Sequence, residues 1–370
     1  GELSGFIDLV RRAAACQVEP GLDALFWYAW AQAFTRDYGG ARATLRRLAE
    51  RIAAERPEEA ASGPLRQRQR AAEIVVNYHL NDLQAVRDDA PAWLAGHENQ
   101  QPFDRAAVAA ALALASLSDH AFGAARQALR EMDSAILHTR SDYGRAWASL
   151  VAATVDAAQG DAAGAERQLR AIDAGLRARL DGETGIVSVL ILMEARVAAD
   201  LGRTAEALER IRLWLPRGVE NGILEITWLA IDVAVDALLT EAAPFDLDTL
   251  GAFAARFGPR LSFLLGVAAS RCLLRAGAFE AAQERLGRLD LIDRDGHLIA
   301  ALPPALSAAE ASAARMAQIE FGTSAGTWRQ AEELAAAALQ AAARDGRRRE
   351  QVELHLTLAA LSENEVFTSL

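Results

Sequence analysis

One turn pattern recurs along the chain at intervals of about 40 residues and restricts its fold more than any other feature. At Gly160 a turn residue is followed by an alanine at the fifth position and a leucine at the ninth. Related patterns open at positions 36, 81, 120, 202, 243, 277 and 326, several with an aromatic residue at the second position. A single helix pair cannot bury its apolar face alone, so neighbouring pairs must stack. The pattern predicts an all-α superhelical solenoid of about eight antiparallel helix pairs, forming one domain over residues 1–370.

The segments before and after each turn differ in polarity. Those before it are apolar on most sides, as in residues 23–34, 186–201 and 259–276. Those after it are more amphipathic, as in residues 163–177 and 205–214. A helix that is apolar all round packs between neighbours, whereas an amphipathic helix faces solvent on one side. We therefore expect two layers, with the first helices of successive pairs lining an inner wall.

Lysine is absent from the chain, which excludes several kinds of active site. A Walker A phosphate loop needs a lysine, and so does a Schiff base to pyridoxal phosphate or a carbonyl substrate. The net charge of -11 argues against a surface for nucleic-acid phosphates, which would need clustered basic residues. The basic run from Arg347 to Arg349 lies beside Glu350, and we expect it to be a solvated helix start. No direct contact with nucleic acid is predicted.

The sequence also bears on the compartment. It contains no apolar run of about 18 residues and no basic stretch followed by an apolar block at its start. Its two cysteines, Cys16 and Cys272, are far apart, and both fall in helical patterns. Two buried, reduced thiols are the simplest interpretation. The sequence thus predicts a cytoplasmic protein that does not contact a membrane.

Some motifs in the chain could indicate catalysis or metal binding, but each can also be interpreted as an ordinary turn or loop. Gly322 to Gly326 matches G-x-S-x-G, but a nucleophile elbow follows a strand, and here a helix is expected first. We therefore expect an interhelical turn. The six histidines lack a metal-ligand spacing such as H-E-x-x-H, and we expect His97 and His297 to be solvated loop residues. No catalytic or metal-binding residue is predicted, and the chain is not expected to be an enzyme.

Several segments resemble one family of regulators. The repeats AAQGDAAGAERQLR and ADLGRTAEALERI, the segment from Arg260 to Asp290, and the ending TWRQAEELAAAALQAAARDGRRREQVELHLTLAAL carry the resemblance. They are similar to the superhelical, tetratricopeptide-like (TPR-like) sensor domain of MalT-type regulators, the large ATP-dependent activators of the LuxR family. The resemblance covers nearly the whole chain. It implies a domain that binds an inducer and takes part in self-association.

The resemblance also implies partners that this chain does not contain. In the family an ATP-binding module precedes the superhelix, and a helix-turn-helix module follows it. Here no phosphate loop precedes the repeats, and SENEVFTSL stands where a further helix pair is expected. We therefore expect a fragment of a larger bacterial transcription regulator. It would have no cofactor of its own, and ATP would bind only to the upstream module.

Ligand contacts are expected from polar and aromatic residues of the first helices, because these line the inner wall. Glu194 and Arg196 stand out because they interrupt a strongly apolar helix, and a buried charge is costly unless it is paired. A structural ion pair or a solvent-facing stripe explains such charges more often than a ligand does, and inner-wall aromatic residues more often serve packing. The candidate contacts are Trp27, Trp30, Asn77, Tyr78, Tyr143, Trp147, Glu194, Arg196, Glu225, Trp228, Asp232 and Arg271.

Two functions fit these patterns. The first is a sensory superhelix that binds a small-molecule effector, relays its presence to the attached modules and takes part in a homo-oligomer. A carbohydrate or aromatic effector would suit tryptophan faces with carboxylates nearby. The alternative is a free-standing TPR-type scaffold that binds a peptide or protein in its concave groove. A phosphate loop upstream and a helix-turn-helix downstream in the same reading frame would favour the first.

Overall fold

The part of the chain that the structure describes is mostly helical. This computed structural model describes residues 5, 8–10, 12, 20–96, 100–139, 141–180, 186–220, 224–237, 259–304 and 306–368. Within these ranges the one β-type pairing is an isolated bridge between Ile292 and Leu298. The predicted all-α class is confirmed. None of the described helices is both long enough and apolar enough to cross a bilayer.

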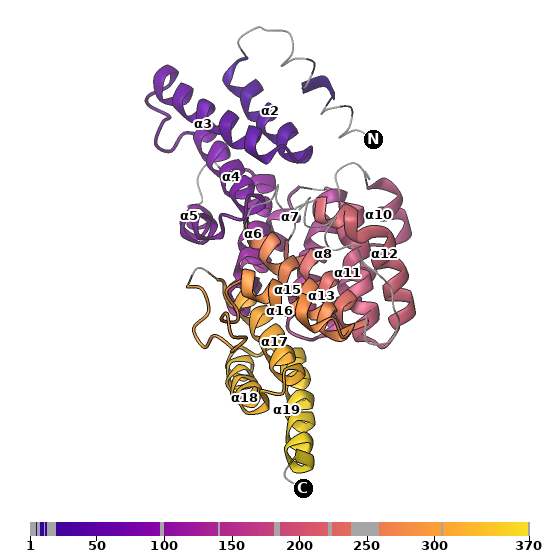
Figure 1. The fold of residues 1–370 in the computed structure, drawn as a ribbon. Coiled ribbons are helices and arrows are strands. Elements are labelled where there is room, and N and C mark those ends of the chain that lie inside the picture. Colours follow the sequence, from indigo (N-terminus) through magenta and orange to yellow (C-terminus); the bar gives the residue numbers. More distant parts are fainter. Residues whose placement is uncertain are drawn as a thin grey trace.

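Most described connections between helices are short, apart from residues 289–307 between α16 and α17, and α2 and α19 lie at opposite ends of the molecule (Figure 1). They are α2 (Leu22–Phe34), α3 (Tyr38–Glu55), α4 (Pro64–His79), α5 (Leu83–Ala95), α6 (Pro102–Leu117), α7 (Phe122–Ile136), α8 (Asp142–Ala158), α9 (Ala162–Arg170), α10 (Ala174–Arg179), α11 (Ile186–Asp200), α12 (Thr204–Glu220), α13 (Leu224–Ala237), α15 (Pro259–Arg275), α16 (Phe279–Arg288), α17 (Ala308–Ser324), α18 (Trp328–Asp345) and α19 (Arg348–Thr368).

The predicted turns share one backbone geometry. Seven of the eight lie in described segments, and each has a positive φ at the predicted residue: Arg36, Asn81, His120, Gly160, Gly202, Gly277 and Gly326. The amide that follows each one donates to a carbonyl five residues back, as from Asp161 to Asp156 at 2.9 Å. A left-handed residue closed by such a bond is the Schellman ending of a helix. The eighth predicted turn, at Ala243, lies outside the described residues.

The motif also determines how closely the two helices of a pair approach. Its fifth position is fully buried at every described turn, by Ala41, Val86, Ala125, Ala165, Ala207, Ala282 and Ala331. Small side chains let two helix backbones lie close together. Three of the second helices also begin with an aspartate cap, because Asp37, Asp82 and Asp161 accept the amides of Gly40, Ala85 and Gly164. The same short segment therefore ends one helix, starts the next and packs the two together.

The described pairs form two layers. Each turn joins helices that pack on each other, as α2 does with α3, α6 with α7, and α17 with α18. The first helices also pack in succession, from α2 through α4, α6, α8, α11, α13 and α15 to α17. This arrangement matches the predicted two-layer stack of helix pairs.

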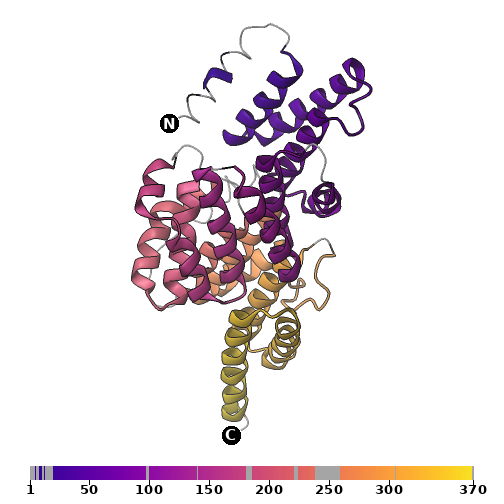
Figure 2. The same cartoon turned by 180° about the vertical axis from the view of Figure 1, so that it is seen from behind.

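The stack curves so strongly that its later helices return to its middle. Both views show the orange helices α15 to α17 beside the middle of the stack, where they border one cavity with α6 and α13 (Figures 1 and 2). At this junction the amide of Ala309, in the first turn of α17, donates to the carbonyl of Ser118 at the end of α6, at 2.8 Å. Helices from the second half of the chain therefore cover part of the inner wall.

Candidate functional site

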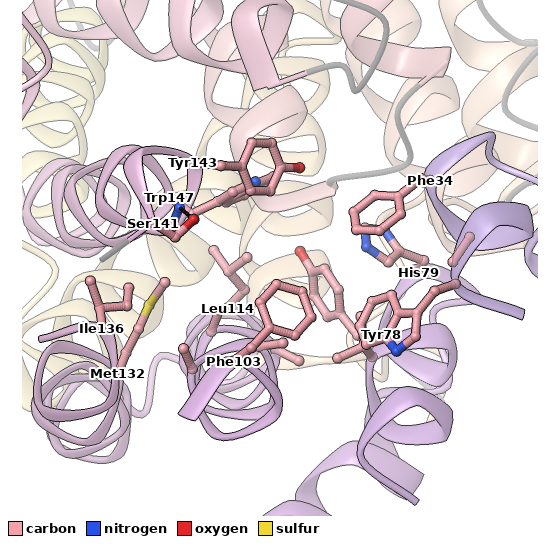
Figure 3. A pocket seen from close by; sticks show the side chains of 18 of the residues that line it. Phe34, Tyr78, His79, Phe103, Leu114, Met132, Ile136, Ser141, Tyr143 and Trp147 are labelled. Carbon is pink, nitrogen blue, oxygen red and sulfur yellow. Dashed lines mark hydrogen bonds between the residues drawn. The ribbon is translucent and has the colours of Figure 1, made fainter. Parts of the chain in front are cut away.

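A cavity of about 140 Å³ lies on the inner wall of the first four helix pairs. The residues around it come mainly from α2, α4, α6 and α8, with others from the start of α3, the end of α7 and the turns between helices, and most are aromatic or aliphatic. We call it the aromatic cavity. Figure 3 shows Phe34, Tyr78 and His79 on one side, Met132 and Ile136 on the other, and Phe103 and Leu114 between them.

Aromatic rings connect the two ends of this wall. Trp30 stacks on Phe34 with ring centroids 5.5 Å apart, and its edge meets Phe103 at 5.5 Å. Phe34 of α2 reaches Tyr143 of α8 at 6.4 Å, and Tyr143 lies 6.4 Å from Trp147 (Figure 3). Edge-to-face pairs at such distances are favourable beyond the area they bury. The first and fourth helix pairs thus meet across the cavity through their rings.

The polar groups at one end of the cavity are mostly uncharged. The rings of Tyr38 and His79 are stacked at 4.5 Å with their planes 4° apart. Burial lowers the pKa of His79 to about 4 and raises the pKa of Tyr38 far above its usual value. Both side chains are therefore neutral at pH 7. Arg36, in the adjacent turn, places a guanidinium group in the lining.

Two polar atoms of this lining have no hydrogen-bond partner among the described residues. They are the indole Nε1 of Trp30 and the Nδ1 of His79, and both atoms are buried. Trp30 as a whole is 4% exposed. A buried polar group without a partner costs about 1–3 kcal/mol, so such groups are rare and require an explanation. An acceptor atom of a bound molecule would remove this cost for Trp30 by displacing the side chains that now cover its N–H.

The second half of the inner wall carries a group of paired charges that we call the inner charge network. Its members come from five successive first helices: Arg196 and Asp200 of α11, Asp232 of α13, Arg271 and Arg275 of α15, Glu320 of α17, and Arg349 and Glu353 of α19. Four guanidinium groups thus face four carboxylates, and the network is balanced.

The network centres on Asp232 and two fully buried arginines. Arg196 binds Asp200 at 2.6 Å and Asp232 at 3.2 Å, and Arg271 also binds Asp232 at 3.2 Å. Burial alone would raise the pKa of Asp232, but the guanidinium groups of Arg349, Arg196 and Arg271 outweigh it and hold that pKa far below its usual value. Removing one partner of a buried ion pair leaves the other uncompensated, which is strongly destabilising. These charges therefore specify which helices are neighbours.

A second cavity, also of about 140 Å³, lies beside the network, and we call it the junction cavity. It is bounded by the C-terminal ends of α6 and α8 together with α13, α15, α17 and α19. Trp228, Asp232, Arg271 and Arg349 line it. The lining of the junction cavity also holds buried polar atoms without a partner among the described residues, such as His120 Nε2, but its aspartate binds both arginines, and we take the more apolar aromatic cavity as the candidate site for a ligand.

The structure brings most of the predicted candidates to these two cavities. Trp30, Tyr78, Tyr143 and Trp147 line the aromatic cavity. Trp228, Asp232 and Arg271 line the junction cavity, and Arg196 binds Asp232 beside it. The structural interpretation of Arg196 as part of an ion pair therefore holds, and the charged and aromatic candidates separate into two places.

The other four candidates line neither cavity or lie outside the description. Trp27 is 39% exposed, and the Arg68 guanidinium lies 5.0 Å from its ring centroid. Asn77 is buried, and Glu194 binds Arg177. The side chain of Glu225 is not among those that the structure describes.

The aromatic-cavity residues that sequence reasoning missed include Phe34, His79 and Phe103. Phe34 and His79 are the last residues of α2 and α4, each just before a left-handed turn. Aromatic side chains that recur at this point of the motif are a signal that could have identified them. Phe103 follows the first residue of α6, and no local pattern distinguishes it.

The predicted solvation of the run from Arg347 to Arg349 is wrong for two of its members. Arg347 is 6% exposed and binds Asp345 at 3.1 Å, and its guanidinium also reaches Glu350. Arg349 binds Asp232 of a distant helix pair. A local sequence window cannot show that α19 returns to the middle of the stack.

Three smaller predictions can be followed into the structure. The stretch from Gly322 to Gly326 ends α17 and turns into α18, as predicted for an interhelical turn. Cys272 is half-buried, and burial raises its pKa to about 11, so its thiol is protonated at neutral pH. Cys16 and His97 lie outside the described residues.

An exposed loop groups three side chains with metal-ligand chemistry. One ligand atom each of Asp293, Asp295 and His297 lies within 4.8 Å of the others, and all three residues are exposed. The predicted solvation of His297 is confirmed, with 62% of its side chain accessible. Exposed acidic groups often cluster without binding a cation, and we assign no metal to this loop.

Neither a protein-family model nor a curated protein matches the chain. Its function must therefore be inferred from the fold and from the chemistry of the two cavities.

Proposed function

We propose that the chain is a sensor domain, and that a small, largely aromatic molecule binds in the aromatic cavity. The partnerless Trp30 Nε1 carries this proposal, because a buried donor in an apolar wall is costly until an acceptor reaches it. Small-molecule sites are typically apolar hollows with a few converging polar groups. The aromatic cavity has this composition, with His79 and Arg36 near one end.

The chemistry of the lining indicates the ligand class. Rings on α2, α6 and α8 provide flat apolar faces at several angles, which suit a planar ring system. The Trp30 N–H calls for one hydrogen-bond acceptor on that ring system. A carbohydrate would present many hydroxyl groups to a lining with few polar atoms, so we favour a heteroaromatic effector.

We further propose that the domain is a TPR-like superhelix of the MalT type and acts in the cytoplasm. The resemblance in the repeats supports this assignment, and so do the recurrent turns and the two-layer packing. In this proposal the domain reports its effector to an ATPase and a helix-turn-helix module of the same regulator, and takes part in self-association.

The test compares two ligands that differ by one acceptor. Quinoline and naphthalene have the same fused-ring shape, but quinoline has a ring nitrogen that can accept the Trp30 N–H. Calorimetry should show quinoline binding about three- to tenfold more tightly, the value of one hydrogen bond. Trp30→Phe should abolish the preference.

A matched variant lies on the same helix. Trp27→Phe makes the same chemical change at a residue outside the cavity lining, and it should leave the preference intact. Equal affinity for both ligands in the unmodified chain would contradict the proposed role of Trp30. Failure of both to bind would contradict the proposed site and favour the peptide-binding alternative.

A further inference from the structure

The N-terminal ends of α17 and α19 rest on the C-terminal ends of α6 and α8. Ala309 of α17 donates its amide to the Ser118 carbonyl that follows α6. At Gly160, just after α8, an added Cβ would lie 3.0 Å from the backbone nitrogen of Arg349. The first contact is a backbone hydrogen bond, and at the second a backbone atom of α19 leaves no free space for a side chain on Gly160, so side-chain rotation cannot absorb a shift. The docking of α17 and α19 depends on where α6 and α8 end.

The charges that α19 contributes are the more accessible part of the inner charge network. The side chains of Arg349 and Glu353 are 29% and 30% exposed, whereas those of Arg196 and Arg271 are 0% and 2% exposed. Exposed ion pairs are weak because water and salt compete for their partners. Without α19, Arg196 would still bind Asp200, and Arg271 would still bind Glu320. Detachment of α19 therefore leaves the buried part of the network paired.

The helices on which α17 and α19 rest are also walls of the aromatic cavity. Along α6, Phe103 and Leu114 line the cavity, and Ser118 follows at the end. Along α8, Tyr143 and Trp147 line it, and Gly160 follows the last turn. A helix transmits a displacement of one end to the other, since its hydrogen-bonded backbone is stiff. A change in the spacing between α6 and α8 would thus alter both the aromatic cavity and the surface on which α17 and α19 dock.

We propose that α19 is a detachable latch whose attachment is coupled to the aromatic cavity through α6 and α8. This proposal rests on the proposed function only in taking the ligand of the aromatic cavity as the signal. A ligand that fixes the spacing of α6 and α8 strengthens the docking of α19, and by reciprocity attachment of α19 raises the affinity for that ligand. Release or capture of α19 is the movement that neighbouring parts of a regulator would detect.

Hydrogen–deuterium exchange of the whole chain tests the coupling without any ligand. Arg349→Ala removes the ion pairs of α19 with Asp232 and Asp200, and Glu353→Ala removes its pair with Arg271. We expect severalfold faster exchange of amides in residues 348–361, and also in residues 103–114 and 143–151 around the cavity. Arg329→Ala is the matched control, because its pair with Glu333 is exposed and stays within α18.

Each result decides one part of the proposal. Unchanged exchange in residues 348–361 would show that α19 is not held by these charges, and the latch would be wrong. Faster exchange confined to α19 would overturn the coupling. A parallel measurement with quinoline on the unmodified chain should slow exchange in residues 348–361. If quinoline does not bind, the proposed function fails, while the two variants still decide whether latch and cavity are coupled.

Discussion

Replacing Gly160 by alanine should destabilise the chain more than the same change at two other turns of the same kind. Gly160, Gly202 and Gly277 have φ values of 81°, 78° and 74°, so alanine suffers similar backbone strain at all three. Nothing lies within 4 Å of an added Cβ at Gly202 or Gly277. At Gly160 the added atom meets the backbone of α19, so the difference between the variants isolates the return of α19 to the middle of the stack.

The expected magnitudes follow from these contacts. A left-handed conformation costs a residue with a side chain about 1–2 kcal/mol, and alanine recovers up to about 1 kcal/mol by restricting the unfolded chain. We therefore expect Gly202→Ala and Gly277→Ala to lose about 1 kcal/mol. At Gly160 the Cβ would lie 3.0 Å from the Arg349 nitrogen and 3.3 Å from the Arg348 Cβ. Such overpacking adds about 1–3 kcal/mol.

The assay is urea unfolding of the three variants, followed by circular dichroism, with the free energies of unfolding compared pairwise. Gly160→Ala should show the lowest stability by a margin larger than the difference between the two controls. Equal losses at all three glycines would refute the reasoning, because α19 would then not press on the end of α8.

Three further predictions concern titratable groups. Asp104 is 1% exposed, and burial raises its pKa to about 6 despite Arg68, so the free energy of unfolding should fall by about 3 kcal/mol as the pH rises from about 4 to 6. Asp104→Asn should remove this fall, as measured by unfolding across that pH range. Burial lowers the pKa of His79 to about 4, so the free energy of unfolding should fall by a similar amount as the pH falls from about 6.5 to 4, and His79→Phe should remove this fall. If either variant keeps the pH dependence of the unmodified chain, the replaced side chain is not buried as described. Cys272, in a Cys16→Ser background, should react with iodoacetamide at pH 8 about 100-fold more slowly than a free thiol, and a rate like that of free cysteine would show that it is exposed.

The turns show how much of this fold is determined by local sequence. Arginine, asparagine and histidine stand at the first three described turns and glycine at the other four, yet all seven have a positive φ. What identified them was the pattern that follows, with its buried small residue at the fifth position. Because turn, cap and helix contact all lie within about ten residues, a sequence window contains everything that determines them.

The candidate site was predictable only in part, because it depends on how the pairs curve. Trp30 and Tyr143 were selected as inner-wall aromatics, but their common cavity arises only because α2 and α8 meet through Phe34. Arg196 and Asp232 were selected for the same reason, yet they bind each other. The sequence indicates which side of a helix faces inward, and the pitch of the stack decides which inward residues meet.

The most direct test of the account is the indole N–H resonance of Trp30, assigned by its loss in Trp30→Phe and observed in the full-length chain by nitrogen–proton correlation spectroscopy. Addition of quinoline should move this resonance downfield, as expected when the N–H gains an acceptor, while the Trp27 resonance stays in place. If saturating quinoline leaves the Trp30 signal unmoved, the buried indole does not bind the ligand, and the assignment of the aromatic cavity as the sensory site is wrong.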